Sequence, residues 1–443
     1  MTRGRAARPS NRRTAAGAAA AVAIGVAAMA FGQTANVERP RTLIVGHPSG
    51  GARADRVDAA RTGRARTALP ASGLRTEWRV PLGALIEHAP LIDARGCTYL
   101  VGTRGEVMAI ARDGTERWRV STDAAQPGPA ALLADDTVVF VDGAGEAVAV
   151  REGAMRWRVP FGRGDAARPA PLPLEDGGVV VATTHELAAL DAEGGVRSRT
   201  TLPEATTLPL VAVRGRVIAI TSSGAVWSWA PGAPEPAHVA SFGSPVDGAA
   251  ALADDHTLVA VTADQMHLTA VDLVHGAATT RALASGGLWL GPPAMRGGTA
   301  HLVLLTPTGE LGVTVDASGI EVARVVLALH PMSVAADGGP GALSVAPHTP
   351  PLVDWSGAFA FATAEGAIGV ATARAVDWLG EACEPPVGSA ARAVAPVVGL
   401  APLEDGAFAA TCHSGALLAI SGRRAAPGRP PFERSGEAAP PPL

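Results

Sequence analysis

The chain has 443 residues, of which 47% are hydrophobic and 18% are charged, and its formal net charge is −4. This composition supplies enough apolar side chains for a large folded core. The mild acidity disfavours nucleic acid or an anionic membrane surface as the main partner. All 37 basic residues are arginine, a bias that a GC-rich genome would produce without a functional cause.

Residues 1–30 have the features of an export signal, because an arginine-rich start precedes an apolar run from Ala15 to Phe31. Ala28-Met29-Ala30 fits a small-x-small cleavage site. An uncleaved anchor is the alternative, since about 17 apolar residues are near the lower limit for crossing a bilayer. Cleavage is favoured, and the loss of five arginines would change the formal charge from −4 to −9. We expect the protein in the periplasm or cell envelope.

Two regions lack sustained periodicity. Residues 31–73 are rich in Gly, Pro and Arg, which predicts a linker that is disordered or draped over the surface of the folded domain. Residues 423–443 are rich in Pro and predict a disordered tail. The folded domain is therefore predicted to span residues 74–422.

A repeat of about 40 residues runs through this domain, the length of a four-stranded propeller blade. The repeat is marked by Trp78, Trp118 and Trp157, which are 40 and then 39 residues apart. Within each copy, short apolar runs alternate with turns that contain Gly or Asp, as in successive hairpins. The turn between the second and third strands recurs eight times, and six copies carry a glycine that can adopt positive φ: Gly105, Gly145, Gly224, Gly309, Gly366 and Gly415.

The eighth copy has no outer strand of its own, whereas the strand-like segment 74–80 precedes the first copy and has no partner. Pairing these two ends would remove exposed strand edges. The sequence thus predicts an all-β, eight-bladed propeller of four-stranded antiparallel blades. Its ring is predicted to close through an N-terminal outer strand that pairs with the last blade.

The third turn and the strand after it resemble the repeat of quinoprotein-type (PQQ-like) propellers, roughly Ala-x-Asp-x-x-Thr-Gly-x-x-x-Trp. The better copies are residues 109–118 and 149–157, and residues 58–64 resemble the lead-in ahead of the first blade in such proteins. The resemblance implies that the outer-strand tryptophans Trp78, Trp118, Trp157 and Trp378 pack between blades. It also implies that Arg199 stands where the third copy would have a tryptophan.

Dehydrogenases of this family hold pyrroloquinoline quinone (PQQ) over a calcium ion beside a disulfide between adjacent cysteines, with Asn and Glu ligands. Here Cys97, Cys383 and Cys412 are far apart, and the only asparagines, Asn11 and Asn36, precede the propeller. We therefore expect neither PQQ nor calcium, and no catalytic, cofactor-binding or metal site. The cysteines are interpreted as buried thiols, although export would permit one disulfide.

Two other constellations have simpler explanations. Asp254-Asp255-His256 with His267 could ligate a metal, but acids at such turns are ordinary hairpin residues. Cys412 beside His413 could form a nucleophile and base, but neighbours in a strand point to opposite faces. The candidate rim contacts are polar residues of the recurring turn, namely Arg104, His185, Glu310 and His413. The insertion at 330–348 is a candidate recognition loop.

These observations favour an exported, non-catalytic and monomeric propeller that binds another protein or an envelope component. It resembles the branch of the family that includes the propeller scaffold of the outer-membrane β-barrel assembly machinery. Nucleic acid is not expected as a partner, and membrane contact is expected only through an uncleaved N-terminal anchor. The alternative is a PQQ- and calcium-dependent periplasmic oxidoreductase, or a small-ligand sensor, that uses the axial channel.

Overall fold

The computed structural model describes residues 52–162, 168–282, 287–306, 308–316, 319–328, 349–363, 366–372, 375–383 and 396–424. The predicted signal at 1–30, the first part of the predicted linker, the 330–348 loop and all but the first two residues of the predicted tail lie outside these ranges. The chain divides into two units, Met1–Pro40 and Arg41–Leu443, and every described residue belongs to the second. No helix within the described ranges is long and apolar enough to cross a membrane.

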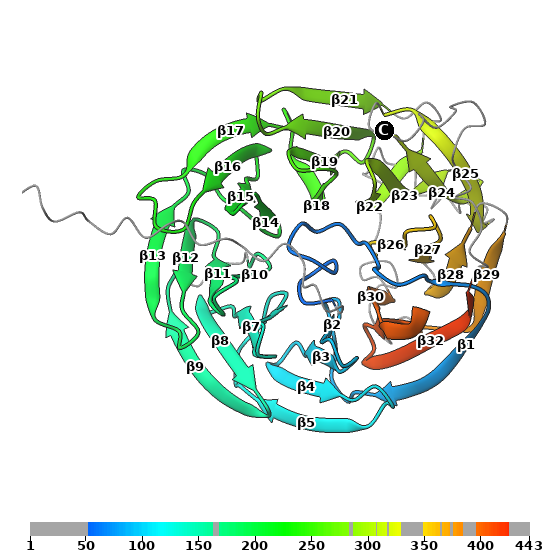
Figure 1. The fold of residues 1–443 in the computed structure, drawn as a ribbon, viewed down its shortest axis with the longest axis horizontal. Helices are drawn as coiled ribbons and strands as arrows, with labels where there is room; N and C mark the ends of the chain where they lie inside the picture. The colour runs from blue at the N-terminus through cyan, green and yellow to red at the C-terminus, as the bar shows by residue number, and fades with distance from the viewer. Residues whose placement is uncertain are drawn as a thin grey trace, which may run out of the picture. The chain divides into compact units, whose positions relative to one another are not determined.

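The described residues form eight four-stranded antiparallel sheets that follow one another around a ring (Figure 1). The predicted eight-bladed propeller is thereby confirmed. Blade one consists of β2 (Leu91–Ile92), β3 (Thr98–Val101), β4 (Glu106–Ile110) and β5 (Glu116–Ser121), and blade two of β6 (Ala131–Leu132), β7 (Val138–Val141), β8 (Glu146–Arg151) and β9 (Ala154–Pro160). Blade three consists of β10 (Leu172–Pro173), β11 (Val179–Ala182), β12 (Glu186–Leu190) and β13 (Val196–Thr201), and blade four of β14 (Val211–Val213), β15 (Arg216–Ile220), β16 (Ala225–Trp229) and β17 (Ala237–Ser241). Blade five consists of β18 (Val246–Leu252), β19 (Thr257–Thr262), β20 (His267–Asp272) and β21 (Ala278–Ala282), and blade six of β22 (Leu288–Arg296), β23 (Thr299–Thr306), β24 (Gly309–Val315) and β25 (Glu321–Ala328). Blade seven consists of β26 (Leu352–Val353), β27 (Phe359–Ala362), β28 (Ala367–Ala371) and β29 (Val376–Ala382). Blade eight consists of β30 (Val397–Pro402), β31 (Phe408–Cys412), β32 (Ala416–Arg424) and β1 (Pro70–Pro81), with the 3-10 turn η1 (Glu404–Gly406) after β30.

The position of a strand within its blade explains its sequence pattern. The second strand of blade two, β7, reads Val-Val-Phe-Val and is buried at all four positions, because a neighbouring blade covers each face of the sheet. The outer strand β5 alternates exposed and half-buried residues along its second half, because one of its faces meets solvent. Apolar side chains from adjacent blades thus form a core between the sheets, such as the cluster that joins Val139 of β7 to Val181 of β11.

The ring closes as the sequence predicts. Strand β1 pairs antiparallel with β32, with Trp78 opposite Ala419 and Val80 opposite Leu417. This outer strand begins at Pro70, four residues earlier than the predicted start of the domain. Residues 70–73 therefore belong to blade eight and not to a linker.

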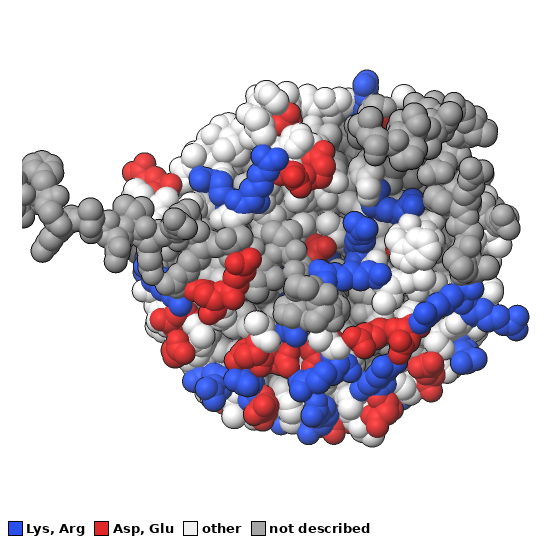
Figure 2. Space-filling model, in the orientation of Figure 1, with Lys and Arg blue, Asp and Glu red and all other residues white. Residues whose placement is uncertain are grey.

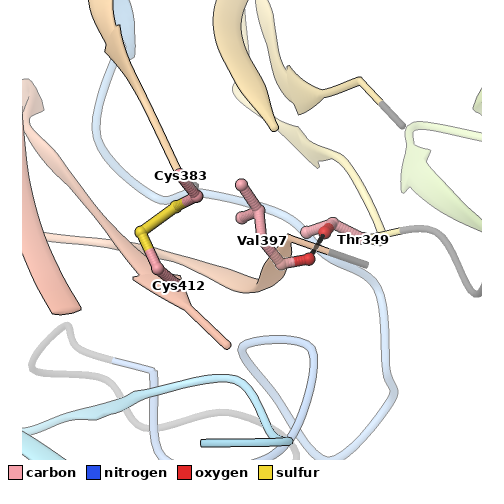
Figure 3. The surroundings of a disulfide bond; sticks show 4 residues. All are labelled: Thr349, Cys383, Val397 and Cys412. Atoms are coloured by element: carbon pink, nitrogen blue, oxygen red, sulfur yellow. Dashed lines mark hydrogen bonds between the residues drawn. A yellow bond between two sulfur atoms is a disulfide. The ribbon is translucent and has the colours of Figure 1, made fainter. Parts of the chain in front are cut away.

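A disulfide joins blades seven and eight, which corrects the interpretation of the cysteines as thiols. Cys383 follows β29, Cys412 ends β31, and their Cα atoms are 5.4 Å apart (Figure 3). Beside the disulfide, the Thr349 hydroxyl donates a hydrogen bond to the carbonyl oxygen of Val397 (Figure 3). Cys97 alone remains a thiol, buried in β-sheet surroundings, and its burial raises its pKa.

Candidate functional site

The recurring turn between the second and third strands forms one part of the rim and holds each blade to its own outer strand. In five blades the residue after the outer strand donates its N–H to the carbonyl oxygen of the turn glycine, at Gly105, Gly145, Gly224, Gly366 and Gly415. These glycines have φ between +79° and +87°. A Cβ at Gly224 would lie 2.0 Å from the carbonyl oxygen of Ser244, so no larger residue fits there. The sixth predicted turn glycine, Gly309, also has positive φ, at +143°.

The structure divides the four candidate rim contacts into two pairs. Arg104 and His185 are exposed, so both side chains are accessible to a partner. Glu310 and His413 are only 2% and 7% exposed. The His413 Nδ1 atom lies 2.9 Å from the carbonyl oxygen of Ile86, so its ring faces the segment after β1. Glu310 and His413 were therefore wrongly predicted as rim contacts, because both side chains are buried.

The two groups of residues considered for metal binding and for nucleophilic catalysis belong to hairpin turns and to a disulfide. The Asp254 carboxylate accepts the backbone N–H groups of His256 and Thr257, as acids in tight turns do. His267 instead pairs with Asp264, whose Oδ2 lies 2.9 Å from its Nδ1. Nowhere in the described ranges do three His, Cys, Asp or Glu side chains gather as a metal site would require. Cys412 is in a disulfide and cannot serve as a nucleophile.

Three of the predicted blade-packing tryptophans share one contact. Trp78, Trp118 and Trp157 each cover a turn glycine of the following blade, namely Gly114, Gly153 and Gly194. A Cβ on any of these glycines would lie between 2.8 and 3.2 Å from the tryptophan. The indole N–H of Trp78 donates to the carbonyl oxygen of Arg112 at 2.8 Å, and that of Trp157 to Ala192 at 2.9 Å. We call this contact the tryptophan interlock.

Strand register corrects the expectation that Arg199 replaces the tryptophan in blade three. Trp118 and Trp157 lie opposite Ala109 and Ala149, and in blade three the equivalent Ala189 faces Ser198, not Arg199. The Ser198 hydroxyl accepts the N–H of Gly232 from blade four, so it replaces the indole.

Trp378 differs from the other three tryptophans. It lies opposite Gly369 in β28 and stacks edge-on against Phe361 of its own blade, with ring centroids 5.3 Å apart. Phe361 in turn packs with Leu290 and Val303 of blade six. Trp378 therefore borders the preceding blade, whereas Trp78, Trp118 and Trp157 face the following one.

The least expected feature lies at the centre of the ring. Residues 52–69, which we call the hub segment, run across the axis of the propeller as the blue central trace in Figure 1. Ile92 of blade one donates its N–H to the carbonyl oxygen of Ala52 at 2.7 Å, and Leu132 of blade two donates to Arg53 at 2.7 Å. The prediction that residues up to 73 are a linker on the surface is wrong for this segment, because most of it is buried.

The remaining blades bind the hub segment in chain order. Backbone N–H groups of Ala212, Leu252, Met295 and Val353, in blades four to seven, donate to carbonyl oxygens of the hub segment at 2.7 to 3.0 Å. Blade eight contributes the carbonyl oxygen of Leu403, which accepts from the Thr67 hydroxyl. Such bonds satisfy polar backbone groups on the inner edges of strands that would otherwise line an open channel.

Arg61 connects blade three to this arrangement. It is fully buried, and its guanidinium donates to the carbonyl oxygens of Ala170 and Pro171 in blade three, Leu210 in blade four and Asp55. Burial lowers the pKa of Arg61 below its ordinary value. With this side chain, all eight blades contact the hub segment.

The described residues lack two features that the family resemblance implies for a site of PQQ and calcium. An adjacent cysteine pair is absent from the sequence, and the disulfide present joins cysteines 29 residues apart. Calcium prefers six to eight oxygen ligands, and the described part of the ring has no cluster of acids that could supply them. The axial region is occupied by the hub segment.

Charged side chains of both signs are interleaved on the face shown in Figure 2, most densely over the lower rim where β4, β5 and β1 lie. Among the described residues of the ring, Arg119 pairs with Glu116 at 2.6 Å and Arg151 with Asp135 at 2.9 Å. On the described part of this face, no broad region carries a single sign of charge. Such a surface gives little long-range attraction for a polyanion.

Comparison with known proteins places the chain among PQQ-like propellers. A family model described as "Outer membrane protein assembly factor BamB" matches residues 33–235 and 103–279, which together span more than half of the chain. The crystal structure of BamB from Moraxella catarrhalis superposes with a TM-score of 0.51 at 16% identity, covering 79% of this chain and 98% of that one. No curated protein sequence matches.

Two enzymes share the fold with higher TM-scores than BamB. A europium-containing methanol dehydrogenase superposes with a TM-score of 0.58 at 11% identity, covering 85% of this chain and 99% of that chain. A quinohemoprotein alcohol dehydrogenase from Pseudomonas putida gives a TM-score of 0.59 at 12% identity, covering 89% and 83%. At these identities the structural likeness establishes the fold alone.

Proposed function

The chain belongs to the PQQ-like repeat family described as outer membrane protein assembly factor BamB, and from this premise we propose that it is an exported, non-catalytic scaffold. Its role is to bind a protein partner in the periplasm or at the cell envelope. The observation that carries this proposal is the hub segment, which fills the axis with the chain's own residues. A propeller whose axis is filled offers its rim as the surface for partners.

The exposed members of the recurring turn mark a candidate contact surface on this rim. Arg104 in blade one and His185 in blade three are exposed side chains on the same kind of turn. The backbone of each turn is fixed, since Gly105 and His185 accept hydrogen bonds from Thr122 and Leu202 after the outer strands. Rigid turns lose little conformational entropy when they bind, which favours recognition at these positions.

The test is chemical cross-linking in the native cell envelope, followed by affinity capture and mass spectrometry. We expect a stoichiometric protein partner whose cross-links concentrate near Arg104 and His185. The double variant R104A/H185A should reduce capture at least about tenfold, as interface residues of the hot-spot class do. The matched control is R199A, which removes an exposed arginine from the outer strand β13 and should leave capture unchanged. Recovery of a partner-free monomer would contradict the proposal.

The quinoprotein alternative rests on the two dehydrogenases that share the fold. It predicts binding of PQQ in the presence of calcium at micromolar concentration. Equilibrium dialysis of the purified protein against PQQ, with and without calcium, separates the two functions. We expect no calcium-dependent retention, whereas saturable retention with one quinone per chain would favour the oxidoreductase.

A further inference from the structure

The turn between the first and second strands of blade seven exposes a tryptophan that the fold does not require. Trp355 is 46% exposed, the highest fraction among the eight tryptophans of the chain. In blades one, two and eight, a backbone hydrogen bond of the same spacing closes the turn, and the equivalent positions hold Ala94, Ala134 and Glu404. The turn therefore forms equally well without an aromatic side chain at this position.

The backbone of this turn is fixed from both sides. The buried Asp354 carboxylate accepts the N–H groups of Ser356 at 2.7 Å and of Leu69, in the hub segment, at 2.8 Å. Nε of Arg296, which ends β22 in blade six, donates to the Trp355 carbonyl oxygen at 2.8 Å. An exposed indole on a rigid turn offers a large contact area and loses little conformational entropy on binding.

Arginines without an acidic partner lie beside this turn. The hub segment runs along it, since the N–H of Ala65 donates to the carbonyl oxygen of Val353 at 2.7 Å. Ala65 is buried, whereas Arg64 and Arg66 on either side of it are exposed. Among the described residues, Arg64, Arg66 and Arg296 form no ion pair. Figure 2 shows arginine side chains gathered near the centre of this face, where the hub segment passes β26 in Figure 1. We call Trp355 and these three arginines the basic patch.

Few acids offset the charge of the basic patch. Asp354 is 0% exposed and its carboxylate accepts backbone N–H groups. In the hub segment, Asp58 accepts from Thr62, and Asp55 lies near the start of β26, before the turn. The adjoining turn of blade eight carries Glu404 and Asp405, of which Asp405 is in an ion pair. The three unpaired arginines therefore leave the surface around the tryptophan positively charged.

We propose that the basic patch binds an acidic polypeptide segment, with carboxylates on Arg64 and Arg66 and an apolar side chain against the Trp355 indole. Guanidinium groups bind carboxylates through charge-assisted and often bidentate hydrogen bonds. Tryptophan and arginine are also the residues that most often dominate the binding energy of protein interfaces. The patch is small and charges of both signs surround it, which favours a short acidic segment over a long polyanion such as nucleic acid.

This site goes beyond the proposed function, because it is a second surface. Trp355 lies in the turn before the second strand of its blade, whereas Arg104 and His185 lie in the turns after the second strands of theirs. The two surfaces are therefore at opposite ends of the strands. A peptide that binds the basic patch needs no partner at the other surface, so the two proposals can fail separately.

The probe is a random library of short linear peptides, selected on the immobilised protein at low ionic strength, where surface charges are least screened. The selected peptides should be enriched in Asp and Glu relative to the unselected library. In fluorescence anisotropy, R64A/R66A should weaken their binding about tenfold or more, and W355A about fivefold or more. A duplex DNA fragment, as a polyanion of another class, should displace them poorly.

The controls separate loss of the site from loss of the fold or of net charge. W355A should keep the melting temperature of the parent protein, because alanine stands at the equivalent position of blades one and two. R156A/R199A removes two exposed arginines from the outer strands β9 and β13, and it should bind the peptides as the parent protein does. R104A/H185A should also leave peptide binding unchanged.

Three results would overturn the proposal. Selected peptides without an acidic bias would mean that the arginines do not recognise carboxylates. Peptide binding that survives R64A/R66A would place the site elsewhere. Displacement by duplex DNA at equal charge concentration would show a general polyanion site and not one for a polypeptide.

Discussion

Two arcs of this ring are built in different ways. From blade eight through blade three, the blades are joined by the same tryptophan interlock at Trp78, Trp118 and Trp157. We call these blades the regular arc. The arc from blade four to blade seven, which we call the irregular arc, lacks the interlock and uses other contacts. Between blades six and seven, His301 packs against Phe359 with ring centroids 6.3 Å apart. Between blades seven and eight, the Cys383–Cys412 disulfide joins the sheets.

The difference shows that blade geometry does not require one type of interface. The ring can still close where the interlock tryptophan is missing, when another contact joins the two blades at that interface. The hub segment explains why such replacement is tolerated, because it bonds to all eight blades independently of the contacts between them. It links the regular arc to the irregular arc at the axis.

The largest effect is expected at the boundary between the arcs. Arg61 bonds to blade three through Ala170 and Pro171 and to blade four through Leu210. R61M should destabilise the protein by about 3–5 kcal/mol, because it leaves buried carbonyl oxygens without donors. Urea unfolding measures the loss, and R64M, at an exposed position of the hub segment, should stay within about 0.5 kcal/mol of the parent. A small effect of R61M would mean that the hub does not join the arcs.

The disulfide should contribute nearly as much. Removing the bond with the double variant C383S/C412S should cost about 3 kcal/mol, because the closed loop of 29 residues loses its restriction in the unfolded chain. Unfolding with and without a reductant gives the same comparison on the parent protein. C97A, which removes the buried thiol of Cys97, is the control and should leave the reductant effect intact.

The interlock itself is tested at Trp157 and at the equivalent Ser198, whose contact with blade four lies at the boundary between the two arcs. W157A should destabilise by about 2–3 kcal/mol, since it removes a half-buried indole from Gly194 and a hydrogen bond to Ala192. S198A, at the matching position of blade three, should cost about 1 kcal/mol or less, because only the bond from Gly232 is lost. Equal losses would remove the distinction between the two arcs.

A pH effect is expected from His301, which lies in the irregular arc. His301 is 1% exposed and bonds to the hydroxyls of Thr299 and Thr314, and burial lowers its pKa to about 3. As the pH falls from about 6.5 toward 3, the unfolded chain takes up a proton that the folded state excludes, so stability decreases. At pH 5 the loss from this residue should be about 2 kcal/mol relative to pH 7.5.

The measurement for His301 is the free energy of unfolding as a function of pH, compared between the parent protein and H301Q. The two curves should diverge at high pH and converge as the pH falls. A parallel pair of curves for the parent and H301Q would show that His301 titrates normally in the folded state.

The sequence predicted the blades because their information is local and repeated. Turn glycines such as Gly105 and the interlock tryptophans recur with the period of a blade, and the closing strand with Trp78 was the one strand left over. The hub segment has no such period. Its small residues and arginines resemble a linker in composition, and its hydrogen bonds go to residues up to 336 positions away.

The errors at single residues have the same origin. Arg199 was assigned to the interlock in place of Ser198 because the bulge between Ala189 and Leu190, which sets the register, depends on pairing between strands. Glu310 and His413 were assigned to the rim because a turn residue is usually exposed, whereas in the folded chain both are buried. The disulfide spans 29 residues without a spacing pattern, so only the fold brings its cysteines together.

The central claim is that residues 52–69 fill the axis as a bonded part of the propeller, and amide hydrogen exchange of this segment tests it most directly. Its own N–H groups are bonded, as in Ala65 to the carbonyl oxygen of Val353 at 2.7 Å and Leu69 to the Asp354 carboxylate at 2.8 Å. Peptides covering residues 52–69 should therefore exchange as slowly as those of the inner strands β14 and β22. Complete exchange within the first seconds would show that the segment leaves the axis open, and it would return the channel to consideration as the functional site.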